Sequence, residues 1–295
     1  MKDLSVIIPA KNEPYLNNTI REVLTKSREE TDVYVTLDGY EPDELIEDSR
    51  VHYIRIPQSE GCHMRQGINE AVTLTRSRFI MKLDAHCLLA EGFDTVLIKA
   101  HQAKLVQIPR RMRLDVKEWK VIEDGRLPID YELIIFQNLI TSAGLASKGF
   151  IWGTVWDEMT RARMDKPIDD IMHFQGSCWF MERSWFTQCG FLSTAYGGFA
   201  QESEEILFGT LKNCGRVVVN KNTYYAHLHK DQVMRQWFEF SPQELKDGNA
   251  YSYNLWVRDR EFFESFVERF MPIPGWPVGW KDSYGIEHYC IIYSR

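Results

Sequence analysis

The sequence lacks the features that define several common protein classes. Its six cysteines are never spaced as C-x-x-C, so a zinc knuckle is not indicated. No apolar run approaches the roughly 18 residues of a membrane span, and the start MKDLSVIIPAKNE has no signal-peptide pattern. We therefore expect free thiols in a reducing compartment, no membrane span and a cytoplasmic location.

An excess of positive charge is also missing. The 295-residue chain has a net charge of −7, so its surface as a whole does not attract nucleic acid, although a local basic patch could. Neither G-x-G-x-x-G nor G-x-x-x-x-G-K-[ST] occurs, which removes the best support for a dinucleotide site or a P-loop. The length suits one large domain, or one domain with an extension.

Short apolar segments alternate with amphipathic ones in the first third of the chain. The alternation predicts an α/β fold, with a mostly parallel sheet flanked by helices. In the second helical segment, Ile68, Ala71, Val72 and Leu74 are expected to face inward. The predicted strands are 4–10, 32–40, 51–57 and 78–86, and the predicted helices are 15–27 and 64–77.

The rest of the chain is less regular. Residues 176–191 predict a strand followed by a helix, 202–216 a helix and 217–230 a strand. From residue 231 the composition becomes richer in aromatic residues than the chain average of 13%. We therefore predict a catalytic domain at 1–230 and a C-terminal extension at 231–295 that packs on it.

The strand FIMKLDAH ends on an acid and an imidazole. Residues i and i+2 of an extended chain share a face, so Asp84 and His86 could bind one divalent cation together. Mixed oxygen and nitrogen ligation suits Mn²⁺, with Mg²⁺ as the alternative, and a diphosphate could fill the open positions. His227 or His229 of YYAHLHK could supply a third ligand. Taken alone, the motif is better explained if Asp84 caps the next segment and His86 is an ordinary loop histidine.

The order of several motifs carries a resemblance. LSVIIPAKNE, TLDGY, RQGINEA and FIMKLDAH together resemble the nucleotide-binding half of a GT-A glycosyltransferase. They are similar to the group that contains the family 2 enzymes and the polypeptide N-acetylgalactosaminyltransferases, the latter carrying Asp-x-His. GSCWFMER, FAQESEE and AHLHK are similar to motifs of the second half. The resemblance covers roughly residues 4–230.

This resemblance implies a metal-dependent transferase that uses a nucleoside-diphosphate sugar, UDP-linked. Asp84, His86 and His227 would hold Mn²⁺ or Mg²⁺, and Asp38 would hydrogen-bond the uracil ring. Glu202 would lie beside the donor sugar and the acceptor hydroxyl, so Asp84 and Glu202 are the expected catalytic residues. The residues expected to contact the nucleotide sugar are Ala10, Lys11, Glu13, Asp38, Arg65, Ala85 and Lys230.

The chain departs from the inverting family 2 pattern at one position. Where those enzymes carry an acidic general base immediately after the glutamate, this chain has Ser203. A serine cannot take the acceptor's proton at neutral pH without a partner base. Either Glu202 or Glu204 serves instead, or the enzyme retains the anomeric configuration, which is the interpretation we favour.

Three acceptor classes remain open: a saccharide or glycolipid precursor, a protein hydroxyl, and a hydroxymethylated base in DNA. The DNA hypothesis depends on a basic stretch around Trp119 that could follow a phosphate backbone. A solvated strand and loop is the simpler interpretation of such a run. The cations concerned are Arg110, Arg111, Arg113, Lys117 and Lys120.

Two other function classes fit the same motifs. A sugar-nucleotide-binding protein without catalysis would keep Asp38 and the metal ligands and lack a usable acceptor site. A nucleotidyltransferase also uses a parallel sheet and metal-bound carboxylates, but it releases pyrophosphate, whereas sugar transfer releases a nucleoside diphosphate. The sequence predicts neither the sugar nor the oligomeric state.

Overall fold

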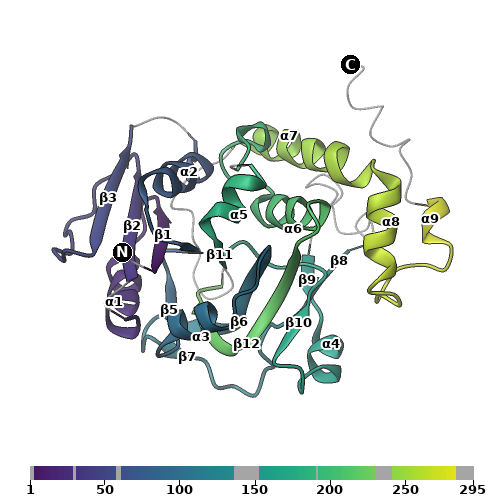
Figure 1. Cartoon of the computed structure of the whole chain (residues 1–295), viewed down its shortest axis with the longest axis horizontal. Helices are drawn as coiled ribbons and strands as arrows, with labels where there is room; N and C mark the ends of the chain where they lie inside the picture. The colour runs from purple at the N-terminus through teal and green to yellow at the C-terminus, as the bar shows by residue number, and fades with distance from the viewer. Residues whose placement is uncertain are drawn as a thin grey trace.

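The chain folds around one large sheet with helices on both faces (Figure 1). The computed structural model describes residues 3–28, 31–57, 61–135, 153–190, 192–229 and 241–283. The sheet contains, in spatial order, β10 (Ile168–Asp170), β12 (Arg216–His227), β6 (Leu105–Asp115), β11 (Cys178–Glu182), β4 (Phe79–Leu83), β1 (Leu4–Ala10), β2 (Thr31–Asp38) and β3 (Val51–Ile56).

Most of these strands are parallel. β1 is parallel to β2 and β4, β2 to β3, and β6 to β12, whereas β11 runs antiparallel between β4 and β6. The carboxyl ends of β1, β2 and β4 therefore meet at one edge of the sheet, where ligands bind in folds of this kind. The predicted α/β fold class is confirmed. Shorter strands complete the pairing: β5 (Cys87–Leu89) on β12, β7 (Lys120–Val121) on β6, and β8 (Glu132–Ile134) on β9 (Gly153–Val155).

Alternating side chains divide the core between the two faces of the sheet. In β1, Val6 and Ile8 face one cluster and Ile7 faces the other, as expected for a strand that is buried on both sides. The first cluster is covered by α1 (Leu16–Lys26) and α3 (Phe93–Lys99). The second is covered by α2 (Met64–Leu74), α5 (Arg183–Gln188) and α6 (Glu202–Lys212). A short helix, α4 (Asp157–Ala162), follows β9.

Helix α2 corrects one expectation. Ile68, Ala71 and Val72 are buried as predicted, but Leu74 is 57% exposed. These buried positions define an i, i+3, i+4 stripe that continues at Thr75, and Leu74 lies off it at the end of the helix. A Cβ at Gly67 would lie 2.6 Å from Oγ1 of Thr36, so a glycine here allows α2 to approach β2 closely.

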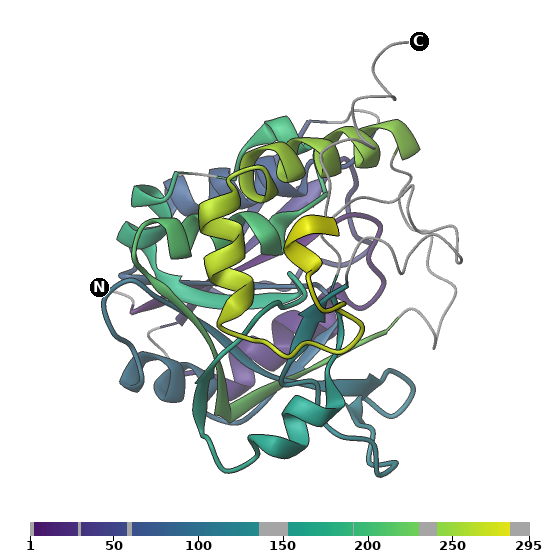
Figure 2. The ribbon, with the colours of Figure 1, turned by 90° about the vertical axis from the view of Figure 1, so that its right-hand side faces the viewer.

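The C-terminal helices pack against α6 and the segment before it (Figure 2). They are α7 (Pro242–Ser252), η5 (Tyr253–Val257), α8 (Arg260–Glu268) and α9 (Trp280–Ser283), and η4 (Thr194–Tyr196) precedes α6. Phe208 of α6 contacts four rings of η5 and α8, with centroids 5.3–6.3 Å apart. A domain boundary at residue 230 stays a prediction. Over the described ranges, no helix is both long enough and apolar enough to cross a membrane.

A charged cluster is buried between β6, β8 and α6. Arg111 forms an ion pair with Glu132, whose other oxygen lies 3.1 Å from Nδ1 of His173. Nε2 of His173 lies 2.8 Å from the Glu204 carboxylate. Burial alone would lower the pKa of His173, but its bonds to the two glutamates raise it to about 9. A Cβ at Gly153 would lie 1.9 Å from the His173 ring, so only glycine fits beside it.

Because the His173 ring is protonated in the fold, we expect the free energy of unfolding to depend on pH. Its pKa rises from 6.5 to about 9 on folding, so its contribution is complete below about pH 6.5 and is lost as the pH rises through about 9. The slope is at most about 1.4 kcal/mol per pH unit. Urea unfolding of the wild type and of His173→Gln over this range measures the effect. The difference in unfolding free energy should shrink as the pH rises, and a constant difference would contradict the assignment.

Candidate functional site

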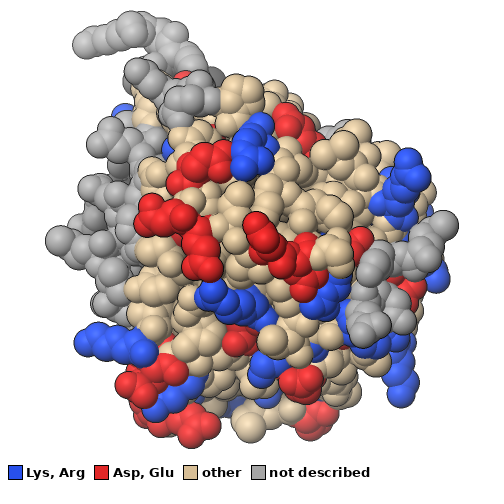
Figure 3. Space-filling model, turned by 90° about the vertical axis from the view of Figure 1, so that its left-hand side faces the viewer, with Lys and Arg blue, Asp and Glu red and all other residues tan. Residues whose placement is uncertain are grey.

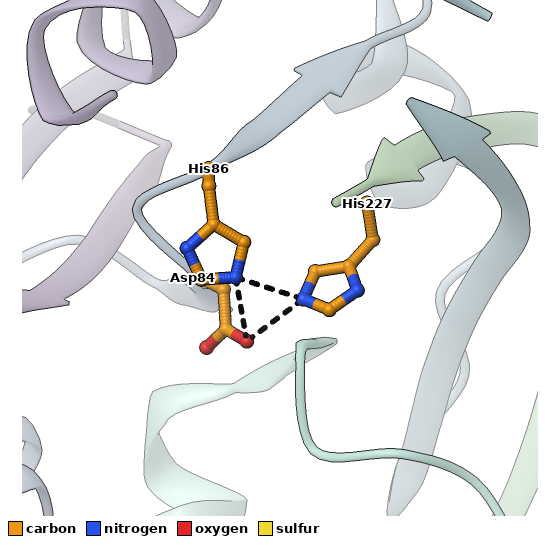
Figure 4. Close-up of side chains that lie close together, drawn as sticks. All are labelled: Asp84, His86 and His227. Atoms are coloured by element: carbon orange, nitrogen blue, oxygen red, sulfur yellow. Dashed lines mark hydrogen bonds and ion pairs between the residues drawn. The ribbon is translucent and has the colours of Figure 1, made fainter. Parts of the chain in front are cut away.

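Three side chains converge at the edge of the sheet that the sequence predicts as the site (Figure 4). Oδ2 of Asp84 lies 3.2 Å from Nε2 of His227 and 3.7 Å from Nε2 of His86. The two Nε2 atoms are 3.0 Å apart. One oxygen and two imidazole nitrogens within 4.8 Å of one another form a donor set that fits a divalent cation such as Mn²⁺.

Strand pairing brings His227 to this position from far along the sequence. Asp84 and His86 lie in the turn between β4 and β5, and β5 pairs antiparallel with the end of β12. In that register His227 is opposite Cys87, next to His86. Of the two histidines that the sequence leaves open, the structure places His227 beside Asp84 and His86. The role of His227 as a metal ligand stays a prediction.

Glu13 orients the first imidazole. Oε2 of Glu13 accepts a hydrogen bond from Nδ1 of His86 at 2.8 Å, so the lone pair of Nε2 faces Asp84 and His227. A carboxylate behind a histidine is the usual arrangement around metal-binding imidazoles. Burial lowers the pKa of His86, and it lowers the pKa of His227 to about 4. Both rings are then neutral at physiological pH, as metal ligation requires.

Lys82 contacts the other oxygen of Asp84. Its Nζ donates to Oδ1 at 2.6 Å and to the carbonyl of Gly176 at 2.6 Å. Burial alone would raise the pKa of Asp84, but Lys82 and the two imidazoles hold it well below its usual range. Asp84 is therefore a carboxylate with one oxygen bound to Lys82 and the other directed at the histidines.

Glu202 lies beside this pair, at the first position of α6. Its Oε1 accepts from Nε1 of Trp179 at 2.6 Å, and its Oε2 forms an ion pair with Lys82 at 3.3 Å. The side chain is buried, and burial raises its pKa. Both predicted catalytic residues, Asp84 and Glu202, therefore form ion pairs with the same lysine, Lys82.

Asp38 ends β2 in a second polar group on the same edge. Its oxygens accept from the backbone N–H of His63 at 2.8 Å and from Nδ1 of the same residue at 2.9 Å. Lys11 forms an ion pair with Asp38 at 3.3 Å. Asp38 and Lys11, both predicted to contact the nucleotide, are therefore adjacent. Ala10 ends β1, and Ala85 is buried between Asp84 and His86.

Arg65 lies apart from these two groups. Its side chain is fully buried, its guanidinium donates to the carbonyls of Ser193 and Ala200 and pairs with Glu205, and it stacks on Tyr196. These contacts join α2 to the segment before α6. Nucleotide binding by Arg65 stays a prediction. Lys230 lies outside the described residues.

A second acidic side chain at the start of α6, Glu204, is engaged away from Asp84. One oxygen lies 2.8 Å from His173 and the other accepts from Oγ of Ser203 at 2.8 Å. Glu202 is bound through both oxygens as well. Glu202 and Glu204 are therefore each held through both oxygens by partners within the fold.

The three arginines of the basic stretch lie in β6 and are engaged within the fold. Arg110 forms two hydrogen bonds with Asp130, at 2.8 and 2.7 Å, and Arg111 pairs with Glu132. Lys117 and Lys120 are exposed. The face of the molecule in Figure 3 intermingles acidic and basic side chains. A role of this stretch in DNA binding stays a prediction.

Sequence reasoning missed the partners that hold the site together: Glu13 as the partner of His86, His63 as the partner of Asp38, and Lys82 and Trp179 as the partners of Glu202. The sequence contains a signal for one of them. Lys82 interrupts the apolar strand FIMKL two residues before Asp84, and lysines are rarely buried unless they are paired. Its position on the same strand face as Asp84 could have identified it.

Comparison with known proteins agrees with this geometry. The family model described as "Glycosyl transferase family 2" matches residues 5–190. A solved structure of GalNAc-T7 with UDP, GalNAc and Mn²⁺ is similar in fold, with a TM-score of 0.67 at 14% sequence identity. The match covers 94% of this chain and 53% of that one, so this chain spans about half the length of the enzyme it resembles. A search of curated proteins found no match.

The structural likeness shows that the predicted GT-A fold is correct. The family model begins in β1 and extends through β4, β11 and α5, so it includes the turn that carries Asp84 and His86. Because this match spans more than half of the chain, the protein belongs to glycosyl transferase family 2.

Proposed function

We propose that the protein transfers a sugar from a UDP-sugar to a hydroxyl acceptor with the help of a divalent cation. The observation that carries this proposal is the convergence of Asp84, His86 and His227, with Glu13 behind His86. The likeness to an enzyme whose structure contains UDP and Mn²⁺ supports it. When bound, Mn²⁺ or Mg²⁺ would offset the negative charge that develops on the leaving diphosphate.

Other residues of the chain would bind the base and position the reacting groups. Asp38, held by His63 and flanked by Lys11, would accept the imide proton of uracil, which cytosine lacks. Glu202, fixed by Trp179 and Lys82, would lie beside the donor sugar and the acceptor hydroxyl. Ala10, Glu13, Ala85, Arg65 and Lys230 complete the set that we assign to nucleotide binding.

Retention of configuration is the outcome we propose. An inverting enzyme needs a base on the acceptor hydroxyl, and both Glu202 and Glu204 are bound through both oxygens within the fold. Ser203, in the position of that base, donates its own proton to Glu204. NMR of the first-formed product decides this point, and an inverted anomeric centre would refute it.

The proposed acceptor is a saccharide or protein hydroxyl rather than a base in DNA. Two of the five cations of the basic stretch, Arg110 and Arg111, are bound to Asp130 and Glu132 and are not available to phosphates. The free thiols of the described cysteines support the proposed cytoplasmic location. Transfer to hydroxymethylated DNA that weakens steeply with salt would reverse this choice of acceptor.

Donor binding provides the direct test. UDP with MnCl₂ is expected to raise the unfolding free energy by about 2.7 kcal/mol at a concentration of about a hundred times Kd, measured as a shift in Tm. CDP is the matched control, because N3 of cytosine carries no proton for Asp38 to accept, and MnCl₂ alone is the second control. Incubation with UDP-sugars should release UDP, and EDTA should stop the release. UDP release that is unaffected by EDTA would contradict the proposal, and so would release of pyrophosphate when UTP and a sugar phosphate are supplied instead.

A further inference from the structure

Lys82 is a buried lysine whose three contacts all point to the site. The side chain is 2% exposed and lies one residue before the end of β4, where its neighbours Met81 and Leu83 are apolar. An ammonium group carries three protons, and Nζ has three acceptors: Asp84, Gly176 and Glu202. Each of the three ammonium protons therefore has an acceptor, either one of two carboxylates or one backbone carbonyl.

The sheet places the partners of Lys82. Asp84 directly follows β4 and is two residues from Lys82. Trp179 of β11 is directly opposite Lys82 in the antiparallel register. This cross-strand pair donates to both oxygens of Glu202, one from the indole and one from the ammonium. Gly176 leaves the space that Glu202 occupies, since a Cβ there would lie 3.1 Å from Oε2.

Without the lysine, this arrangement would place two carboxylates close together in a buried setting. Glu202 is 5% exposed, so water would screen its charge poorly. Asp84 would also lose the hydrogen bond that occupies Oδ1 and leaves Oδ2 directed at His227. Lys82 therefore controls both the direction of one carboxylate and the charge beside the other.

We propose that Lys82 is a positioning residue that joins the metal site to Glu202. It holds Asp84 with a single oxygen presented to the cation, and it keeps Glu202 beside that oxygen. The inference rests on the proposed function, because it assigns Lys82 to the metal site named there. It adds a link that neither the Asp-x-His motif nor the helix start at Glu202 contains.

Lys82→Met tests the proposal, since methionine has a similar length and no charge. Mn²⁺ binding, followed by electron paramagnetic resonance at a temperature well below Tm, is expected to weaken about 10- to 100-fold. With saturating Mn²⁺, kcat is expected to stay below the wild-type value, because Glu202 has lost one of its two donors. The matched control is Lys221→Met, a half-buried lysine on β12 whose Nζ contacts the carbonyl of Arg163, and it should leave both quantities unchanged.

Simple electrostatics predicts the opposite sign, which makes the measurement decisive. If Lys82 acted only as a positive charge near the cation, its removal would tighten Mn²⁺ binding, and tighter or unchanged binding would overturn the proposal. Glu202→Gln adds the second arm. The loss caused by Lys82→Met should be severalfold smaller in this background, because repulsion from Glu202 is gone. An equal loss in both backgrounds would refute the link to Glu202.

The outcome can be separated from failure of the proposed function. Asp84→Asn removes a proposed ligand itself, so normal Mn²⁺ binding in that variant would refute the metal site and with it the role of Lys82. Loss of binding in Asp84→Asn together with wild-type binding in Lys82→Met would refute only the positioning role. A melting curve in the absence of metal confirms that each variant is folded before binding is measured.

Discussion

Asp84→Asn is expected to lower sugar transfer about a thousandfold, equivalent to about 4 kcal/mol of transition-state stabilisation, while the protein stays folded. An amide has nearly the shape of the carboxylate but offers the cation no anionic oxygen. In the wild type, Lys82 and the two imidazoles favour the charged form of Asp84 over the protonated one. Lys82 keeps Gly176 and Glu202 as acceptors in the variant, so its cation is not left alone.

The experiment compares UDP release and Mn²⁺ binding in Asp84→Asn and in a matched control. Asp170→Asn also replaces an aspartate at a strand end, in this case one that pairs with Arg216 at the edge of the sheet, and it should transfer sugar like the wild type. Circular dichroism and a melting curve verify the fold of both proteins. Full activity of Asp84→Asn would contradict the metal-dependent mechanism at its centre.

The fold was predictable because each layer leaves a local signal. Segments such as LSVIIPA are buried on both sides and therefore apolar throughout, and the βα alternation then requires a parallel sheet. Asp38 and Asp84 could be placed at one edge for the same reason. Leu74 shows where the argument fails: an apolar residue at the end of a helix can lie off the buried stripe.

The contacts that complete the site depend on distances in sequence that no local pattern encodes. Glu13 reaches His86 across 73 residues, and His227 reaches Asp84 across 143. The β5–β12 pairing that selects His227 over His229 involves a three-residue strand, which is too short to recognise from composition. The family resemblance could name His227, but the partners of Lys82 and Glu202 emerge only once β4, β11 and α6 are packed together.

Glu132→Ala is expected to destabilise the protein by about 3–5 kcal/mol, the cost of leaving a buried charge without its partner. Glu132 is shared by two cations, Arg111 and His173, and its removal leaves Glu204 as the acidic partner of the ring. Burial alone would raise the pKa of Glu132, but the two cations lower it to about 2, so the wild-type residue is fully ionised at neutral pH. Urea unfolding measures the loss.

Two control variants test whether the loss of stability comes from burial of an unpaired charge. Asp124→Ala breaks an exposed pair with Arg126 and should change the unfolding free energy by less than about 1 kcal/mol. Combining Arg111→Met with Glu132→Leu removes both members of the buried pair and should cost less than Glu132→Ala alone, because no unpaired guanidinium remains. If Glu132→Ala costs no more than Asp124→Ala, the cluster does not stabilise the fold. A large loss would instead show that the cluster stabilises the fold, in which His173 joins Glu132 of β8 to Glu204 at the start of α6.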